Sequence, residues 1–266
     1  MDMQNKTAVV TGGSRGIGRA LCRALHQAGA RHVAVADLDG AGAQALAAEI
    51  GGSGHEVNVA DESQVVALID EVEQAHGPID LFVSNAGVGE LPPDSKNIAS
   101  QPNAVWERCW SVNVMAHVYA ARRLIPGMVE RGDGYLINVA SAAGLLSQIG
   151  DAAYSSTKHA AVGLAESLAI SHGDDGIKVS VVCPQAVATA LIGYDEDGDE
   201  APTGIAGNDL DGILSVDDAA AAIMQGIADE SFLILTHPQV VQYMQHKAEN
   251  YGRWVGGMRK LRRRYV

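Results

Sequence analysis

A glycine-rich turn near the start of the chain constrains the fold most strongly. An apolar run at residues 7–10 leads directly into Thr11-Gly12-Gly13-Ser14-Arg15-Gly16-Ile17-Gly18, and a helical pattern follows to about residue 28. Glycines let a backbone turn tightly and approach a pyrophosphate at a helix N-terminus, where free N–H groups favour anions. The spacing is G-x-x-x-G-x-G, and it serves this task as well as G-x-G-x-x-G does. The turn therefore indicates a dinucleotide site between a first strand and a first helix.

The remaining chain repeats this alternation of strand and helix. Apolar runs at 32–36, 56–59, 79–83, 135–139, 178–182 and 232–235 are separated by helical patterns, which include long helices at 103–131 and 152–172. Such alternation predicts right-handed crossovers and an α/β fold, a Rossmann-type doubly wound parallel sheet of about seven strands with helices on both faces. No linker interrupts residues 5–236. We expect one domain at 1–236 and a helical extension at 237–266 packed on it.

Charge and composition exclude several classes of partner. The net charge of −13 argues against nucleic acid, because phosphates would be repelled. Six basic residues lie in the last fourteen positions, and we interpret them as the end of a terminal helix rather than a polyanion or membrane-surface site. The three cysteines show no C-x-x-C spacing, and no apolar run reaches membrane-spanning length. We expect a cytoplasmic protein with no metal and no membrane partner.

A tyrosine and a lysine one helical turn apart indicate acid/base chemistry. Tyr154 and Lys158 are at i and i+4, so they share a face of the 152–172 helix. A nearby ammonium lowers the pKa of a phenol by favouring the phenolate, so we expect Lys158 to lower the pKa of Tyr154. Ser141, thirteen positions earlier, could hold a substrate oxygen against that phenol. Alone, this spacing also fits a solvated helix face.

Asp37 predicts which dinucleotide is bound. It ends the second apolar run, nineteen residues after Gly18, where a carboxylate can accept both hydroxyls of the adenosine ribose. A carboxylate there also repels a 2′-phosphate, which favours NAD and makes NADP the less favoured cofactor. Arg15 opposes this prediction, because an arginine in the glycine turn could receive that phosphate.

Taken together, these residues resemble the short-chain dehydrogenase/reductase family. The resemblance spans residues 6 to about 192 and adds Asn85-Ala86-Gly87, Asn113 and Pro184 through Thr189. It implies Tyr154 as general acid/base and Ser141 as the holder of the substrate oxygen. It implies Lys158 as the binder of the nicotinamide ribose and Asn113 as the anchor of a proton-relaying water. The expected cofactor-binding set is Gly12, Ser14, Arg15, Gly16, Ile17, Gly18, Asp37, Asn58, Val59, Asn85, Ala86, Gly87, Tyr154, Lys158, Pro184, Val187 and Thr189.

The chain departs from the family pattern at three places. Asn58 stands where the family usually has Asp, and Gln185 follows Pro184 where glycine is usual. The usual terminal Val-Asp-Gly-Gly strand is absent, and residues 240–261 carry apolar side chains at helical spacing instead. The resemblance implies a homodimer or homotetramer through 103–131 and 152–172, of which the dimer is the safer prediction. We expect an acidic, glycine-spotted substrate lid at about 189–215.

The expected substrate is a small, neutral and fairly apolar alcohol or ketone. The expected substrate-binding residues are Ser141, Ala143, Gln148, Tyr154, Gln185 and Leu191, and a wider expected lining adds Val88, Leu145, Ile149, Ala186 and Ile192. The acidic 193–212 stretch supplies no cation for an anionic substrate. We predict an NAD-dependent oxidoreductase that interconverts a secondary alcohol and a ketone. The alternatives are an NADP(H)-dependent carbonyl reductase and a catalytically silent dinucleotide-binding scaffold.

Overall fold

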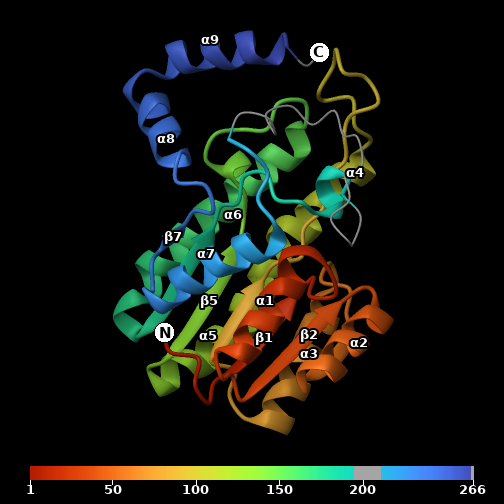
Figure 1. Cartoon of the computed structure of the whole chain (residues 1–266), viewed down its shortest axis with the longest axis vertical. Coiled ribbons are helices and arrows are strands. Elements are labelled where there is room, and N and C mark those ends of the chain that lie inside the picture. The colour runs from red at the N-terminus through yellow and green to blue at the C-terminus, as the bar shows by residue number, and fades with distance from the viewer. Residues whose placement is uncertain (195–210, 265–266) are drawn as a thin grey trace.

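One parallel sheet organises the computed structural model, which describes residues 1–194 and 211–264 (Figure 1). The sheet order is β3-β2-β1-β4-β5-β6-β7, and every neighbouring pair is parallel. This order confirms the predicted Rossmann-type sheet in a single α/β domain. The strands are β1 (Thr7–Thr11), β2 (His32–Asp37), β3 (Ser53–Glu56), β4 (Leu81–Ser84), β5 (Gly134–Val139), β6 (Ile177–Val182) and β7 (Leu233–Ile234).

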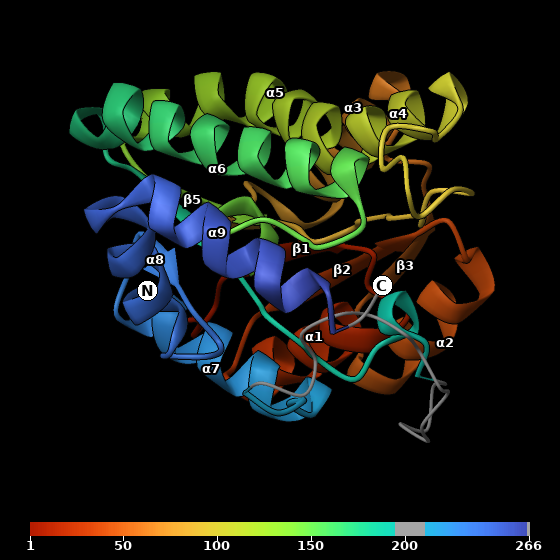
Figure 2. The same cartoon turned by 90° about the horizontal axis from the view of Figure 1, so that it is seen from above.

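Helices cover both faces of the sheet, and each layer buries its own aliphatic core (Figure 2). One layer contains α1 (Gly16–Gln27), α2 (Gly40–Ile50) and α7 (Val216–Ala228). The other contains α3 (Glu62–His76), α4 (Asn103–Trp110), α5 (Ala116–Arg131) and α6 (Ala152–His172). Strands β1, β4 and β5 are buried throughout, which is why they read as continuous apolar runs in the sequence. The predicted caps Asp61 and Ser215 each accept a backbone N–H at the start of α3 and α7.

The third strand was predicted at the wrong residues. The apolar run at 56–59 continues from the strand as irregular chain, and β3 pairs with β2 through Ser53 to Glu56. Its inward side chains are polar, since the Ser53 hydroxyl lies 2.8 Å from ring nitrogens of both His32 and His55. An edge strand held by such contacts has no apolar alternation by which to recognise it.

The two long helices around the site form as predicted, with one irregularity. Helices α4 and α5 are joined by a π-helical turn at Ser111–Met115, so residues 103–131 form one continuous helical segment. Widened turns of this kind are frequent at functional sites. The turn contains Asn113, which is fully buried.

The C-terminal segment forms two helices, α8 (Val240–Glu249) and α9 (Tyr251–Arg262). They break at Asn250, whose backbone is extended and whose side-chain oxygen accepts from Arg253 N–H to begin α9. Figure 2 shows α9 crossing between the two helical layers, above the carboxyl ends of the strands. No helix within residues 1–194 or 211–264 has the length and apolar character needed to cross a membrane.

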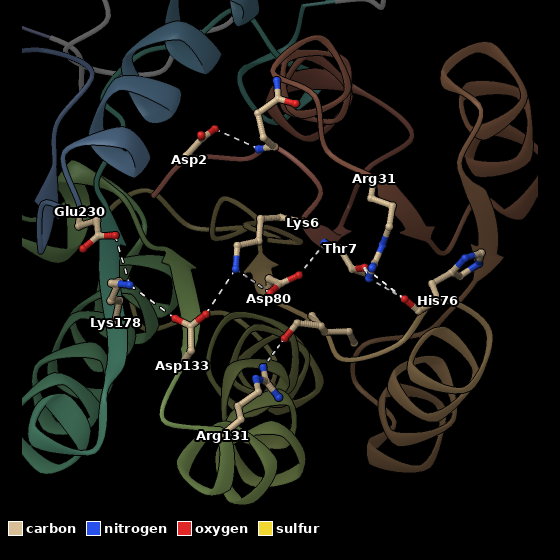
Figure 3. Close-up of polar contacts among 12 residues, drawn as sticks. Asp2, Lys6, Thr7, Arg31, His76, Asp80, Arg131, Asp133, Lys178 and Glu230 are labelled. Atoms are coloured by element: carbon tan, nitrogen blue, oxygen red, sulfur yellow. Dashed lines mark hydrogen bonds and ion pairs between the residues drawn. The ribbon is translucent and has the colours of Figure 1, made fainter.

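An ion-pair network connects several strands at the end of the sheet where they begin (Figure 3). Lys6 Nζ lies 3.0 Å from Asp80 and 3.4 Å from Asp133, and Lys178 Nζ lies 3.6 Å from Asp133 and 3.2 Å from Glu230. Hydrogen bonding to Asp80 raises the pKa of Lys6. Asp80 also accepts the Thr7 N–H at 2.8 Å, so the network connects the starts of β1, β4, β5 and β6. Each pair is partly exposed and worth at most about 1 kcal/mol, so the network aligns strands more than it stabilises them.

Two histidines make the stability of the fold depend on pH. His117 on α5 is buried, and desolvation, then the charge of Lys158, lowers its pKa to about 4. Desolvation, then the nearby His76 and His55, lowers the pKa of His32 to about 4. The unfolded chain takes up these protons near pH 6.5, before the folded chain does. The contribution of these two histidines to the free energy of unfolding is therefore fully present above pH ~6.5 and decreases as the pH falls from ~6.5 towards 4.

We predict that His117→Met flattens this pH dependence, because methionine fills the site without a proton to gain. Urea unfolding between pH 7.5 and 5.5 measures the slope. His159→Gln, which replaces an exposed histidine, is the control and should keep the parental slope. An unchanged slope in His117→Met would show that the ring is already protonated in the folded state.

Candidate active site

A cleft of about 1970 Å³ runs along the carboxyl ends of the strands. Ligand sites in open α/β sheets occupy this edge, and this cleft is larger than the ~300–1000 Å³ of an ordinary small-molecule pocket. Of the predicted cofactor and substrate residues, Ser14 is the one that does not line the cleft; all others do. Among the predicted catalytic residues, Asn113 lies behind its wall. Of the wider expected lining, Leu145 does not line the cleft, whereas its neighbour Leu146 does.

The glycine turn is shaped by close backbone approaches. Gly12 and Gly16 have φ of +62° and +55°, and a Cβ on Gly18 would lie 2.1 Å from the Gly12 carbonyl oxygen. The side-chain amide of Asn85 donates to the carbonyls of Thr11 and Gly12 at 2.9 and 3.0 Å. Asn85 therefore fixes the turn. The N-terminus of α1 is left with no acidic residue in its first turn, which suits an anion.

Asp37 is held in a fixed orientation at the end of β2. One carboxylate oxygen accepts the Ser14 N–H and the other accepts the Asp39 N–H, each at 3.0 Å. Ser14 thus acts through its backbone, and its buried hydroxyl has no partner among the described residues. Arg15 is exposed, and its side chain makes no capping bond to α1. Leu38, which the sequence interpretation did not select, is 70% exposed beside Asp37 and lines the cleft.

The two ends of the cleft are bounded by different loops. Asn58 is exposed, and its side-chain oxygen accepts Ala60 N–H, which holds the loop after β3. At the other end, Thr189 packs against Gly16, because a Cβ on that glycine would lie 3.3 Å from Thr189 Cγ2. Pro184 and Val187 are buried in the loop after β6. A side chain at position 16 would therefore crowd Thr189 at this end of the cleft.

Ser141, Tyr154 and Lys158 meet at the middle of the cleft. Asp151 caps α6 by accepting the Tyr154 N–H at 2.9 Å, which fixes the first turn of that helix. Lys158 is buried, its Nζ donates to the Val139 carbonyl at 3.0 Å, and it lies 5.6 Å from the centre of the Tyr154 ring. The Ser141 hydroxyl accepts the Ala143 N–H at 3.1 Å and donates to the Pro184 carbonyl at 3.4 Å.

The expected lowering of the Tyr154 pKa by Lys158 is wrong for the protein alone. Desolvation raises the pKa of Tyr154 to about 12, although contact with the Ser141 hydroxyl opposes the rise. Desolvation also lowers the pKa of Lys158 to about 8. Burial therefore opposes charge on both groups, and the lysine ammonium is directed at a backbone carbonyl instead of the phenol. At neutral pH Tyr154 is therefore a neutral phenol, and Lys158 is an ammonium whose pKa of about 8 lies close to neutrality.

Asn113 makes structural contacts with all of its amide atoms. Its Oδ1 accepts the Val88 N–H at 2.9 Å, and its Nδ2 donates to the Val88 carbonyl at 2.8 Å and to Thr157 Oγ1 at 3.1 Å. Gly87 lies between this amide and the lysine, because an added Cβ there would be 3.2 Å from Lys158 Nζ. Asn113 thus connects the loop after β4 to α6.

The predicted substrate residues lie around the open half of the cleft. Ala143 is buried beside Ser141, Gln148 is half-buried, and Leu191 is 47% exposed. Gln185 Nε2 donates to Asp211 at 2.8 Å, and the same carboxylate accepts the Tyr243 hydroxyl at 2.8 Å. Gln185 therefore connects the loop after β6 to α8. Most of the predicted lid lies at residues 195–210, outside the described part of the chain.

Sequence reasoning missed the contribution of α9. The helical apolar spacing was recognised, but its position over the cleft was not, because no local signal places a terminal helix on a distant edge. Two cations outside the 193–212 stretch, Arg253 of α9 and Arg108, line the cleft, and the sequence alone does not indicate this. Arg108 is paired with Glu90. Within the described residues no group of three or more His, Cys, Asp or Glu could hold a metal ion.

Comparison with known proteins identifies the family. The family model for short chain dehydrogenases matches residues 6–199. The chain belongs to the short-chain dehydrogenase family. Its fold is therefore that of an oxidoreductase family. A solved structure with a similar fold is a short-chain dehydrogenase/reductase from Burkholderia phymatum in complex with NAD. The two superpose with a TM-score of 0.80 at 27% identity, and the match covers 95% of this chain and 96% of that one.

Two curated relatives of this short-chain dehydrogenase are 34% identical to it. One is 3beta-hydroxysteroid dehydrogenase 2 of Eggerthella lenta, matched over 84% of this chain and 88% of its own. The other is 1-deoxy-11-beta-hydroxypentalenate dehydrogenase of Streptomyces exfoliatus, matched over 89% and 85%. Relatives of this kind support alcohol dehydrogenase activity, and the NAD-bound neighbour supports binding of a nicotinamide dinucleotide.

We predict that Asn113→Ala destabilises the fold in addition to any effect on turnover. It leaves the Val88 N–H and carbonyl without their buried partners, which should cost about 2–6 kcal/mol at ~1–3 kcal/mol per unsatisfied group. Urea unfolding measures the loss, and Asn103→Ala, at an exposed position on α4, is the control. Unfolding of Asn113→Ala at the parental urea midpoint would contradict the structural role of the amide.

Proposed function

We propose that this short-chain dehydrogenase uses NAD to interconvert a secondary alcohol and a ketone, with Tyr154 as the general acid/base. One observation carries the proposal. The cleft that holds Ser141, Tyr154 and Lys158 continues without interruption to the glycine turn and Asp37. A hydride acceptor and a proton acceptor can therefore serve one carbinol group.

The residues at the two ends of the cleft fit a dinucleotide. The glycine turn and the N-terminus of α1 would hold the pyrophosphate, and Asp37 the adenosine ribose. Lys158 would bind the nicotinamide ribose, and Val187 and Thr189 the carboxamide. Bound NAD supplies the acceptor for the hydride that leaves the carbinol carbon. The fixed carboxylate of Asp37 favours NAD, whereas the exposed Arg15 is the basis for the NADP alternative.

Tyr154 would move the proton that accompanies the hydride. In oxidation, the alcohol O–H bond breaks, its proton passes to the Tyr154 phenolate, and the C–H electron pair leaves as hydride, so that a ketone remains. In reduction, the phenol returns the proton to the ketone oxygen while Ser141 holds that oxygen. The raised pKa of about 12 keeps Tyr154 protonated and ready for reduction. For oxidation near neutral pH, positive charge from Lys158 and the oxidised cofactor must lower that pKa.

The substrate class follows from the relatives and from the lining. The two named relatives act on a hydroxysteroid and a hydroxypentalenate, both ring alcohols of substantial size. The lining of the cleft includes Leu146, Ile149, Leu191 and Ile192, which suits an apolar ring system. The intact set of Ser141, Tyr154, Lys158 and Asn113 weighs against a silent dinucleotide-binding scaffold, which has no need of all four.

A homodimer through the outer faces of residues 103–131 and 152–172 remains our proposal for assembly. Trp110 on α4 is 48% exposed and Ile170 on α6 is 84% exposed on these faces. Large apolar side chains exposed on neighbouring helices are typical of a subunit contact.

We predict that Tyr154→Phe lowers kcat by at least ~100-fold, the low end for general acid/base catalysis, with little change in NADH affinity. Phenylalanine keeps the ring and removes the proton carrier. Steady-state oxidation of a ring alcohol and a fluorescence titration with NADH measure the two effects. Tyr119→Phe, on α5 outside the cleft, is the control. Turnover of Tyr154→Phe near the parental rate would exclude Tyr154 as the acid/base.

We predict a preference for NAD over NADP in kcat/KM, and a shift of at least ~10-fold (about 1.4 kcal/mol) towards NADP in Asp37→Ala. Alanine removes the carboxylate that repels a 2′-phosphate and leaves Arg15 in place. Asp61→Asn, which changes a carboxylate outside the cleft, is the control. An unmodified protein that prefers NADP would show that Arg15 decides cofactor choice.

A further inference from the structure

One face of α9 lines the same cleft as Ser141, Tyr154 and Lys158. The lining positions are Asn250, Arg253, Trp254, Gly257, Met258 and Leu261, which follow the i, i+3, i+4, i+7, i+8, i+11 spacing of a single helical face. An amphipathic helix normally buries its apolar face in the protein core. In the described structure no residue of α9 is buried, and Trp254, Met258 and Leu261 are only partly covered. The apolar face therefore lines the cleft.

Three contacts fix α8 and α9 to the loops that carry the site. Lys247 Nζ donates to the Leu145 carbonyl at 2.6 Å, four residues after Ser141. The same ammonium lies 5.0 Å from the Trp254 ring and 5.4 Å from the Tyr251 ring, both within cation–π range. Arg262 donates to the Ser95 carbonyl at 3.1 Å in the loop before α4.

The third contact comes through α8, where Tyr243 and Gln185 share Asp211. Each of the three contacts joins the C-terminal helices to a different loop around the cleft. The position of Trp254 is therefore set relative to Ser141 through Lys247.

We propose that α9 is the substrate-recognition element of this dehydrogenase and that Trp254 and Met258 hold the far end of a large, apolar, fused-ring alcohol. The inference rests on the proposed function for the position of the carbinol at Tyr154. The cleft volume exceeds an ordinary pocket by about twofold, so a dinucleotide and a large second molecule fit together. A small alcohol would leave the Trp254 face in water. A flat ring system would cover it with the contact area that aromatic side chains provide.

Lys247 is a positioning residue in this scheme. It does not line the cleft, but its bond to Leu145 and its contact with Trp254 hold the recognition face at a fixed distance from Ser141. Loss of this tie should weaken capture of a ring alcohol more than it slows chemistry, because the reacting groups lie on α6 and the loop after β5.

The test compares a 3-hydroxysteroid, as the fused-ring alcohol, with cyclohexanol. Trp254→Ala should lower the steroid-to-cyclohexanol ratio of kcat/KM by at least ~10-fold, within the range that apolar pocket contacts supply. Val255→Ala, on the outer face of α9 and 43% exposed, is the matched control and should keep the parental ratio. Lys247→Met should raise KM for the steroid with kcat largely retained, and Lys247→Arg should restore it.

A binding experiment separates this inference from the proposed function. Calorimetry with Tyr154→Phe, NADH and the matching 3-ketosteroid measures recognition without turnover. Binding that is lost in the Tyr154→Phe/Trp254→Ala double variant supports the inference even if Tyr154 is not the acid/base. Oxidation of cyclohexanol with no detectable steroid binding or turnover overturns it and leaves the proposed function intact. A change of oligomeric state in Trp254→Ala with an unchanged substrate ratio also overturns it, because α9 would then contact a second copy.

Discussion

Burial of Tyr154 and Lys158 together is the constraint on which the site depends. Each group loses hydration on entering the cleft wall, so the phenol holds its proton more tightly and the ammonium more weakly than in water. The surrounding fold supports this arrangement with fixed backbone groups, because Asp151 anchors the start of α6 and the Val139 carbonyl receives the lysine. Asn113 and Gly87 complete the wall behind the lysine. A positive charge that reaches the cleft should therefore favour loss of a proton from both Tyr154 and Lys158.

The two edges of the sheet have separate tasks. Where the strands begin, Lys6, Asp80, Asp133 and Lys178 form a charge-balanced network that aligns β1, β4, β5 and β6. Where they end, polar side chains that include Asp37, Ser141 and Tyr154 line the cleft. Alignment at one edge allows the other edge to keep buried and poorly paired groups, since stability and function draw on different residues. The C-terminal helices then close the functional edge with contacts made to its loops.

The sequence was sufficient for the sheet, the glycine turn and the Tyr154–Lys158 pair, because buried parallel strands and helical i, i+4 spacing leave direct patterns. It misplaced β3, whose inward side chains Ser53 and His55 form polar contacts that no apolar pattern reveals. It gave the wrong sign for the Tyr154 pKa in the protein alone, since a motif shows that Lys158 is near but not that both groups are desolvated. It also left α9 without a position. A helix that follows the last strand can pack anywhere its contacts allow, and here those contacts are Lys247 to Leu145 and Arg262 to Ser95.

The most direct measurement is the ionisation of Tyr154 by NMR with [¹³Cζ]tyrosine, in the protein alone and with NAD, with the resonance assigned by its loss in Tyr154→Phe. The account predicts that the phenol does not titrate below pH 10, the value for free tyrosine, when the protein is alone. With NAD, the added positive charge should move its pKa below 10. A phenol that titrates below pH 10 without ligand, or whose pKa is the same with NAD, would contradict the claim that burial sets the resting state of Tyr154 and cofactor charge activates it.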